Sequence, residues 1–336
     1  MPVHFSLLDL APVKEGGAIA EAFRNSVDLA RHAEQWGFTR FWIAEHHNMP
    51  GIASAATSLL IGHVAEGTSR IRVGSGGIML PNHAPLTIAE QFGTLEALYP
   101  GRIDLGLGRA PGSDEAASRA LRYDTAEENF PRAVAELLAY LAPAGPGQRL
   151  IAFPGVGSRV PLWLLGSSTY SAQLAAGMGL PFAFASHFAP ALLMEAIEVY
   201  RSAFTPSEYL DRPYVMVGVP LVAAESDEKA RYLATASLQR QVRLIRRQPI
   251  FIPPPVESMD GIWSEAEKYL VSTRMAIAVT GGPDTVREKL AHLLRETGAD
   301  EFIFVSDFYD HADRLRSFEI AADAMKQLGA STGELR

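Results

Sequence analysis

A few histidine, arginine and serine residues of this 336-residue chain have side chains that could carry out chemistry. Histidines occur at His46, His47, His83 and His187, and a histidine can accept or release a proton near neutral pH. Arg109 could hold an anion or form an ordinary ion pair with a carboxylate. Taken alone, His83 and His187 are better explained as loop residues than as catalysts. These residues form a site only if the fold brings them together.

A serine-rich turn is the second candidate for a binding site. An apolar run at residues 162–165 leads into the segment Gly166, Ser167, Ser168, Thr169, Tyr170, Ser171. A helix start rich in hydroxyls and small residues suits a phosphate, because its free backbone N–H groups and its dipole both favour an anion. The same residues would also serve as nothing more than a helix N-cap.

A strand interrupted by glycines lies at the start of residues 70–112. Residues 71–80 are apolar enough to be covered on both faces, yet they include Gly74, Gly76 and Gly77. Glycine inside a strand marks a bulge, or a place where something flat and bulky approaches the backbone closely. Apolar residues then recur at helical spacing and a second strand follows, so the stretch is expected to form a right-handed parallel crossover.

Strand and helix alternate along the whole chain. Strands are predicted at residues 3–8, 41–44, 71–80, 103–107, 162–165, 182–185, 215–222 and 302–305. The main helices are predicted at residues 18–35, 54–65, 88–98, 126–141, 190–204, 227–246, 284–297 and 312–328. This order predicts an α/β fold with a single domain at residues 1–336, a (β/α)8 TIM barrel. A doubly wound open sheet is the alternative.

An insertion between strand seven and strand eight is expected at about residues 246–282. It helps to make the chain about 80 residues longer than a typical barrel of ~250 residues. Residues 248–263 are rich in proline and follow no regular periodicity. We expect this segment to be too polar for the core and to run over one face as a functional excursion.

In a barrel, the carboxyl ends of all strands meet at one rim, where active sites lie. The predicted strands end at His46–His47, His83, Arg109, the serine-rich turn and His187, so these residues should converge there. Adjacent residues of a strand point to opposite faces, so His46 and His47 cannot both line a pocket as part of that strand. Two neighbouring histidines without a third ligand indicate a metal only weakly, and no metal site is predicted.

Composition excludes several classes of protein. The chain has 30 basic and 38 acidic residues, a net charge of -8, which argues against a nucleic-acid or anionic-membrane surface. The absence of cysteine excludes disulfides, thiolate catalysis and cysteine-bound metals.

Neither a signal peptide nor an apolar run of membrane-spanning length is present, so a cytoplasmic location is expected. The segment from Gly106 carries Pro111 in place of the third glycine of a dinucleotide fingerprint, so no nicotinamide site is predicted.

Four motifs occur together in an order and spacing typical of one known family. They are FWIAEHH (41–47), IRVGSGGIMLPNHAP (71–85), YPGRIDLGLGRAPG (99–112) and LLGSSTYSAQLAAGMGLPFAFA (164–185). Through them the chain resembles the bacterial luciferase-like flavin-dependent monooxygenases over nearly its full length. The resemblance implies a TIM barrel that binds FMN at its carboxyl-terminal mouth, with O2 as co-substrate. It also implies that a separate flavin reductase supplies reduced FMN and that the protein forms a homodimer.

The resemblance also implies roles for particular residues. Gly76 and Gly77 match a non-prolyl cis peptide whose backbone faces the flavin ring. Arg109 matches an arginine near the flavin phosphate, and His46 matches a catalytic histidine beside the reactive face of the flavin. The phosphate loop of the family matches the serine-rich turn, with Gly166, Ser167, Ser168, Tyr170 and Ser171 as cofactor-binding residues. The implied activity is an FMN-dependent monooxygenation of a small, mostly apolar organic substrate.

Departures from the family pattern narrow this expectation. The light-emitting members carry a cysteine where this chain has Gly108, and their histidine of the third loop lies one position later than His83. No light emission is therefore predicted. An F420-dependent hydride-transfer enzyme and a non-catalytic flavin-binding protein remain alternatives, with a zinc-dependent barrel hydrolase a distant fourth.

Overall fold

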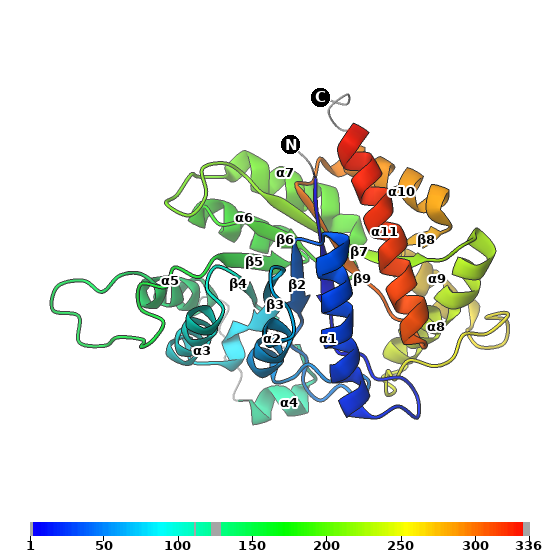
Figure 1. The fold of residues 1–336 in the computed structure, drawn as a ribbon, viewed down its shortest axis with the longest axis horizontal. Helices are drawn as coiled ribbons and strands as arrows, with labels where there is room; N and C mark the ends of the chain where they lie inside the picture. Colours follow the sequence, from blue (N-terminus) through cyan, green and yellow to red (C-terminus); the bar gives the residue numbers. More distant parts are fainter. Residues whose placement is uncertain (1–2, 111, 122–128, 332–336) are drawn as a thin grey trace.

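A closed barrel of parallel strands organises the protein. The structure, a computed structural model, describes residues 3–110, 112–121 and 129–331 (Figure 1). In the described residues eight strands pair in the ring order β1, β2, β3, β4, β5, β6, β7, β9 and back to β1. Their bounds are β1 (His4–Asp9), β2 (Arg40–Ile43), β3 (Arg72–Met79), β4 (Ile103–Gly108), β5 (Leu162–Gly166), β6 (Phe182–Phe184), β7 (Val215–Ala223) and β9 (Glu301–Val305). The predicted TIM barrel is confirmed.

Helices surround this barrel and cover the outer face of its strands (Figure 1). They are α1 (Ile19–Trp36), α2 (Thr57–Glu66), α3 (Pro85–Leu98), α5 (Asn129–Leu141), α6 (Thr169–Met178), α7 (Leu193–Ala203), α8 (Asp227–Ile245), α10 (Pro283–Thr297) and α11 (His311–Ser331). Short 3-10 turns, η1 (Leu80–Asn82) and η2 (Pro190–Leu192), precede α3 and α7. The predicted start of one helix at residues 126–128 and the residue Pro111 lie outside the described ranges. No helix within those ranges combines the length and the apolar character that crossing a bilayer requires.

The insertion is more regular than predicted. It contains a helix, α9 (Glu265–Arg274), and a short strand, β8 (Val279–Gly281), which pairs with the end of β7 outside the ring. A capping box between Ser264 and Glu267 starts α9, because each side chain bonds the backbone N–H of the other residue. A further short helix, α4 (Glu115–Ala120), was not predicted either.

The expectation that residues 248–263 are too polar for the core is wrong for four residues. Ile250, Ile252, Pro253 and Met259 are buried, while Pro254 and Ser258 remain exposed. The backbone of Ile252 also pairs with the loop after β1, where its N–H donates to the Val13 carbonyl at 3.0 Å. A few apolar anchors thus fix a segment whose average composition is polar.

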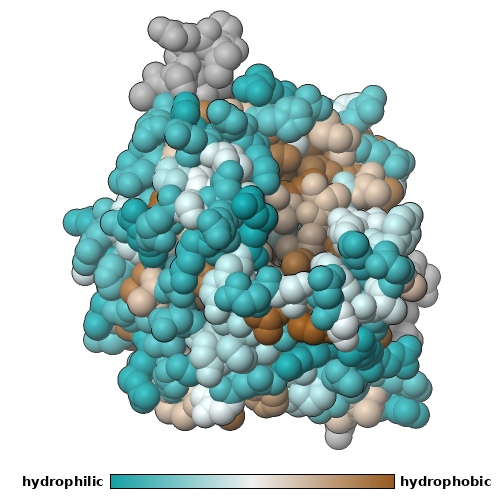
Figure 2. Space-filling model, turned by 90° about the vertical axis from the view of Figure 1, so that its right-hand side faces the viewer, coloured by the Kyte–Doolittle hydropathy of each residue, from teal (hydrophilic) through white to brown (hydrophobic). Residues whose placement is uncertain are grey.

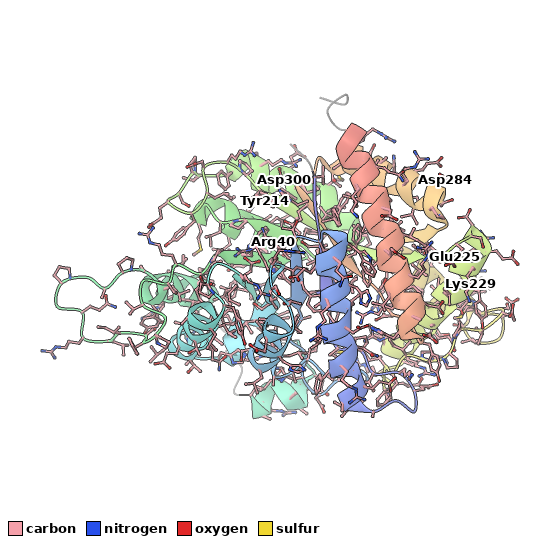
Figure 3. All side chains as sticks on the ribbon, viewed as in Figure 1. Arg40, Tyr214, Glu225, Lys229, Asp284 and Asp300 are labelled. Carbon is pink, nitrogen blue, oxygen red and sulfur yellow. The ribbon has the colours of Figure 1, made fainter. Side chains whose placement is uncertain are left out.

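An ion network fills the barrel interior where the strands begin. Arg40 donates to Asp104 at 2.7 Å and to Glu301 at 3.2 Å, and both carboxylates are fully buried. Arg72 also binds Asp104, at 2.6 Å, and the Tyr214 hydroxyl donates to Glu301 at 2.9 Å. Figure 3 shows Arg40 and Tyr214 toward this end of the barrel. Above the network, Leu8, Trp42, Trp163, Met216 and Ile303 form an apolar plug. The amino-terminal end of the barrel interior is therefore closed by described residues, and the two main cavities lie toward the carboxyl ends of the strands.

The face of the molecule that carries α8, α9 and α10 is largely hydrophilic (Figure 2). One hollow on this face gathers apolar side chains (Figure 2). The helical layer therefore presents mostly polar residues to water while its inner side packs on the barrel.

Candidate active site

Two adjoining cavities lie at the carboxyl ends of the strands. The smaller cavity, of about 170 Å³, is lined by Gly76, Gly77, Arg109 and the start of the serine-rich turn. The larger cavity, of about 300 Å³, is lined by His46 and by residues of α8 and of the insertion. Both cavities share the lining residues Leu8, Gly76, Met79, His187 and Phe188. One molecule with a flat body and a tail could therefore occupy both.

A bulge in β3 forms part of the wall between the cavities. The pairing of β3 with β4 shifts its register between Ser75 and Ile78, and the Gly76–Gly77 peptide bond is cis, as the resemblance implied. A Cβ atom on Gly77 would come within 2.7 Å of the Gly106 carbonyl oxygen, so a larger residue would not fit. The predicted bulge is confirmed, and it presents backbone without side chains to both cavities.

The serine-rich turn presents hydroxyls and a helix start to the smaller cavity. Ser168 is the N-cap of α6, but its side chain makes no capping hydrogen bond. Ser167, Ser168 and Ser171 line the cavity, and their hydroxyls have no hydrogen-bond partner in the described part of the chain. The first N–H groups of a helix also lack partners within the helix. This arrangement is suited to bind an oxyanion such as a phosphate.

Arg109 brings a positive charge to the same cavity from the end of β4. Its guanidinium carbon lies 4.4 Å from the centre of the Tyr170 ring. Tyr170, predicted as a cofactor-binding residue, is not among the described residues that line the cavity. It contacts Arg109 instead, and stacking on a ring face favours one orientation of a guanidinium group.

His46 lines the larger cavity and His47 does not, although both follow the end of β2 at Ile43 and so lie outside the strand whose alternation suggested this. The Nδ1 atom of His46 lies 3.4 Å from the Gly112 carbonyl oxygen. Burial lowers the pKa of His46 to about 4, because it disfavours the charged ring. At neutral pH the ring is uncharged, and a proton on Nδ1, donated to Gly112, leaves Nε2 able to accept another.

Glu45 holds two further histidines of this rim, His47 and His83. Its carboxylate is almost fully buried and contacts His47 Nε2 at 2.8 Å and His83 Nε2 at 2.9 Å. The amide of Asn82 donates to the same carboxylate at 3.2 Å. Burial by itself raises the pKa of Glu45, but the hydrogen bonds from His83, His47 and Asn82 outweigh it and lower the pKa. Asn82 and His83 thus fasten the end of β2 to the loop after β3.

His187 is a rim residue whose role the sequence left open. It lines both cavities, its ring centre lies 4.2 Å from that of Phe188, and its Nδ1 atom has no hydrogen-bond partner among the described residues. Burial lowers the pKa of His187 to about 4, with a further lowering from nearby His46 and an opposing effect of Asp307. A second neutral histidine therefore faces the space that His46 lines.

An arginine and an aspartate of the larger cavity escaped the sequence analysis. Arg240 of α8 is only 6% exposed and forms an ion pair with Asp307, which follows β9. Its Nε atom donates to the Ile250 carbonyl at 2.9 Å, so it also ties the insertion to the barrel. Asp307 lies two residues after the end of β9, and this position could have identified it as a candidate site residue. Arg240 lies within α8, and nothing in the local sequence distinguishes it from other helix residues.

The fold and the site define a (β/α)8 barrel with ligand-binding cavities at the carboxyl ends of its strands, and comparison with known proteins identifies the family. Residues 3–301 match the sequence model of the luciferase-like monooxygenases, so the chain belongs to that family. It is 57% identical to the protein YvbT of Bacillus subtilis strain 168 over 96% of each chain. It is 53% identical to a luciferase-like monooxygenase of Escherichia coli strain K12, over 97% of this chain and 98% of that one.

Solved structures share the fold. The crystal structure of apo-MsnO8 has a TM-score of 0.86 and 36% identity, and the match covers 96% of this chain and 98% of that one. An oxygenating constituent of 3,6-diketocamphane monooxygenase from Pseudomonas putida, solved with FMN, has a TM-score of 0.69 at 22% identity over 96% and 97% of the two chains. An F420-dependent secondary alcohol dehydrogenase also has a TM-score of 0.69, at 14% identity over 97% and 99%. At this identity the last two show the common fold alone.

Proposed function

We propose that the protein is an FMN-dependent monooxygenase that acts with O2 on a small, mostly apolar organic substrate. A separate flavin reductase supplies the reduced FMN, and the active protein is a homodimer. The observation that carries the proposal is the serine-rich turn with Arg109 on a cavity that continues, past a wall of bare backbone, into a second cavity with a neutral histidine.

The residues present fit FMN. Its phosphate would be held by Ser167, Ser168 and Ser171, by the first N–H groups of α6 and by Arg109. Its ring would lie against the backbone of Gly76 and Gly77, where any side chain would clash with β4 or with Leu8. When bound, FMN supplies the redox chemistry and the activation of O2.

The chain itself would bind, orient and manage protons. His46, uncharged at neutral pH, would accept a proton at Nε2 as a general base beside the substrate. His187 would keep a second uncharged ring at the boundary of the two cavities. The apolar walls, which include Leu8, Met79 and Phe188, would exclude water from the reacting groups.

An F420-dependent hydride transfer is the second candidate, because an F420-dependent enzyme shares this barrel. Titration of the purified protein with FMN, riboflavin and F420 separates the possibilities. We expect FMN to bind at least about tenfold more tightly than riboflavin, since riboflavin lacks the phosphate. Photoreduced FMN should then support oxygen consumption.

The outcomes of this test are distinct. Tight binding of F420 without oxygen consumption would favour hydride transfer, and FMN binding without any oxygen consumption would indicate a non-catalytic flavin-binding protein. Absence of affinity for every flavin and deazaflavin would refute the proposal. Sedimentation velocity measures whether the protein is a homodimer.

A further inference from the structure

Arg240 has a hydrogen-bonding group without a partner. Its Nη1 atom pairs with Asp307 and its Nε atom with the Ile250 carbonyl, but its buried Nη2 atom has no hydrogen-bond partner among the described residues. A buried donor without an acceptor costs roughly 1 to 3 kcal/mol. A ligand that brings an acceptor to this guanidinium group removes that cost.

A second arginine lies on the same cavity. Arg274, half-buried at the end of α9, lines the larger cavity and makes no hydrogen bond or ion pair within the described ranges. The last turn of a helix favours a cation, so Arg274 alone would not identify a ligand. Together with the unpaired donor of Arg240, however, it gives the cavity two guanidinium groups with unused donors.

The charges that line the larger cavity do not balance. Among the described residues of the lining, Arg240 and Asp307 compensate each other, His46 and His187 are uncharged at neutral pH, and Arg274 is left as one positive charge. The whole chain carries a net charge of -8, so this local excess does not follow from its composition. A cavity with one uncompensated positive charge is complementary to a ligand with one negative charge.

The rest of the lining is mostly apolar, with Ser237, Gln241, Thr280 and Ser306 as its uncharged polar side chains. Most of the remaining wall is formed by the side chains of Leu10, Met49, Ile52, Val222, Leu244 and Met275. The volume of about 300 Å³ is at the lower end of ligand pockets, which range from ~300 to 1,000 Å³. The occupant is therefore small, with an apolar body.

We propose that the larger cavity binds a small organic monoanion, a carboxylate on an apolar chain, with the carboxylate on Arg240 and Arg274 and the chain along Met49, Ile52 and Met275. The inference rests on the proposed function in naming this molecule as the substrate class. Binding itself requires neither flavin nor turnover.

Calorimetric titration of the purified protein with octanoate and with 1-octanol tests the proposal, because the two probes share a chain and differ in charge. We expect octanoate to bind at least about tenfold more tightly than 1-octanol. Arg274→Gln should weaken octanoate binding by about tenfold and leave 1-octanol unchanged. Arg240→Lys, which keeps the charge beside Asp307 but removes the Nη2 donor, should weaken octanoate binding to a similar degree.

Arg295→Gln is the matched control. Arg295 is exposed on α10 and does not line the cavity, so this variant makes the same change in net charge and should bind octanoate like the unaltered protein. Equal affinities for octanoate and 1-octanol would overturn the proposal, and so would octanoate binding that Arg274→Gln leaves unchanged. Because Arg274 has no hydrogen-bond or ion-pair partner among the residues that the structure describes, that variant decides the question even if Arg240→Lys unfolds.

Titration of the same variants with FMN separates this inference from the proposed function. Arginine-dependent octanoate binding in a protein that binds no flavin would support the anion site and refute the monooxygenase. Flavin-dependent oxygen consumption in a protein that does not distinguish octanoate from 1-octanol would do the reverse.

Discussion

At the scale of single residues, two histidines beside the larger cavity are held uncharged. Burial lowers the pKa values of both His46 and His187 to about 4, from an ordinary value of 6.5. Since each ring also lies near the other, protonating one makes protonation of the second harder. Neutral bases at physiological pH are thus built into the site, and they couple the stability of the protein to pH.

The free energy of unfolding should fall as the pH drops from 6.5 toward 4. In this window the unfolded chain binds protons at both histidines, whereas the folded protein binds them only near pH 4. The contribution of the two neutral histidines to the free energy of unfolding is therefore fully present above pH 6.5. At pH 5 this contribution is smaller by about 2 kcal/mol per histidine. Urea denaturation at pH 7 and pH 5 measures the loss.

The double variant His46→Gln, His187→Gln provides the control for this prediction. Its stability should fall less between pH 7 and pH 5 than that of the unaltered protein, because only other groups still titrate. Equal losses in the two proteins would show that the histidines do not carry the pH dependence.

At the scale of elements, the N-cap serines of α6 and α9 have different roles. Ser264 closes a capping box with Glu267 at the start of α9, whereas Ser168 at the start of α6 leaves its side chain without a capping bond. The Ser264 hydroxyl thus accepts a hydrogen bond from a backbone N–H in the first turn of α9. The Ser168 hydroxyl remains available to the smaller cavity.

Ser264→Ala and Ser168→Ala should therefore separate stability from binding. Loss of the cap at Ser264 should lower the free energy of unfolding by about 1 kcal/mol and leave FMN affinity unchanged. Ser168→Ala should change stability by less than about 0.5 kcal/mol and weaken FMN binding by about tenfold. Thermal unfolding and FMN titration of both variants provide the measurements, and a reversed pattern would contradict the assignment of the turn.

The bulge of β3 requires a residue without a side chain at position 77, because the backbone of β4 lies too close for a Cβ atom. A methyl group at Gly77 would press on the Gly106 carbonyl at 2.7 Å, so Gly77→Ala should lower the free energy of unfolding by about 1 to 3 kcal/mol. Gly177 lies within α6 and a methyl group there would meet nothing within 4 Å. Gly177→Ala should therefore be neutral or stabilise by up to about 1 kcal/mol. Urea denaturation compares them, and similar effects of the two changes would exclude close packing as the reason for Gly77.

At the scale of the whole molecule, the barrel divides into a closed end and an open end. The network of Arg40, Arg72, Asp104, Glu301 and Tyr214 closes the amino-terminal end, and the two cavities open at the other. Arg40 joins β2 to both β4 and β9, which are distant in the chain. The network is therefore expected to stabilise the closed ring and not to take part in binding.

Arg40→Met should destabilise the protein by about 3 to 5 kcal/mol, because it leaves the buried carboxylates of Asp104 and Glu301 short of positive charge. Arg316→Met is the matched control. Arg316 pairs with Glu225 and Glu319 on the surface and should contribute at most about 1 kcal/mol. Equilibrium unfolding in urea gives both values, and a loss at Arg40 no larger than at Arg316 would contradict the role of the network.

Much of the fold could be predicted because its signals are local. Apolar strands that alternate with stretches of helical spacing specify the barrel. Strand alternation does not explain the different directions of His46 and His47, because both follow the end of β2 at Ile43. The missed elements had local signals too, since Ser264 and Glu267 have the spacing of a capping box. Because the insertion is polar on average, this capping box was not predicted. The burial of Ile250 and Ile252 was not predicted for the same reason.

By itself the sequence determined the barrel, the family motifs and the rim on which His46, Arg109 and the serine-rich turn lie, because periodicity and strand ends follow from short stretches of chain. Only the tertiary structure decided which side chains meet. It paired Arg240 with Asp307, which are 67 positions apart, and His83 with Glu45, which are 38 positions apart. Contacts between residues so far apart depend on how the elements pack against one another, and neither composition nor local spacing records that packing.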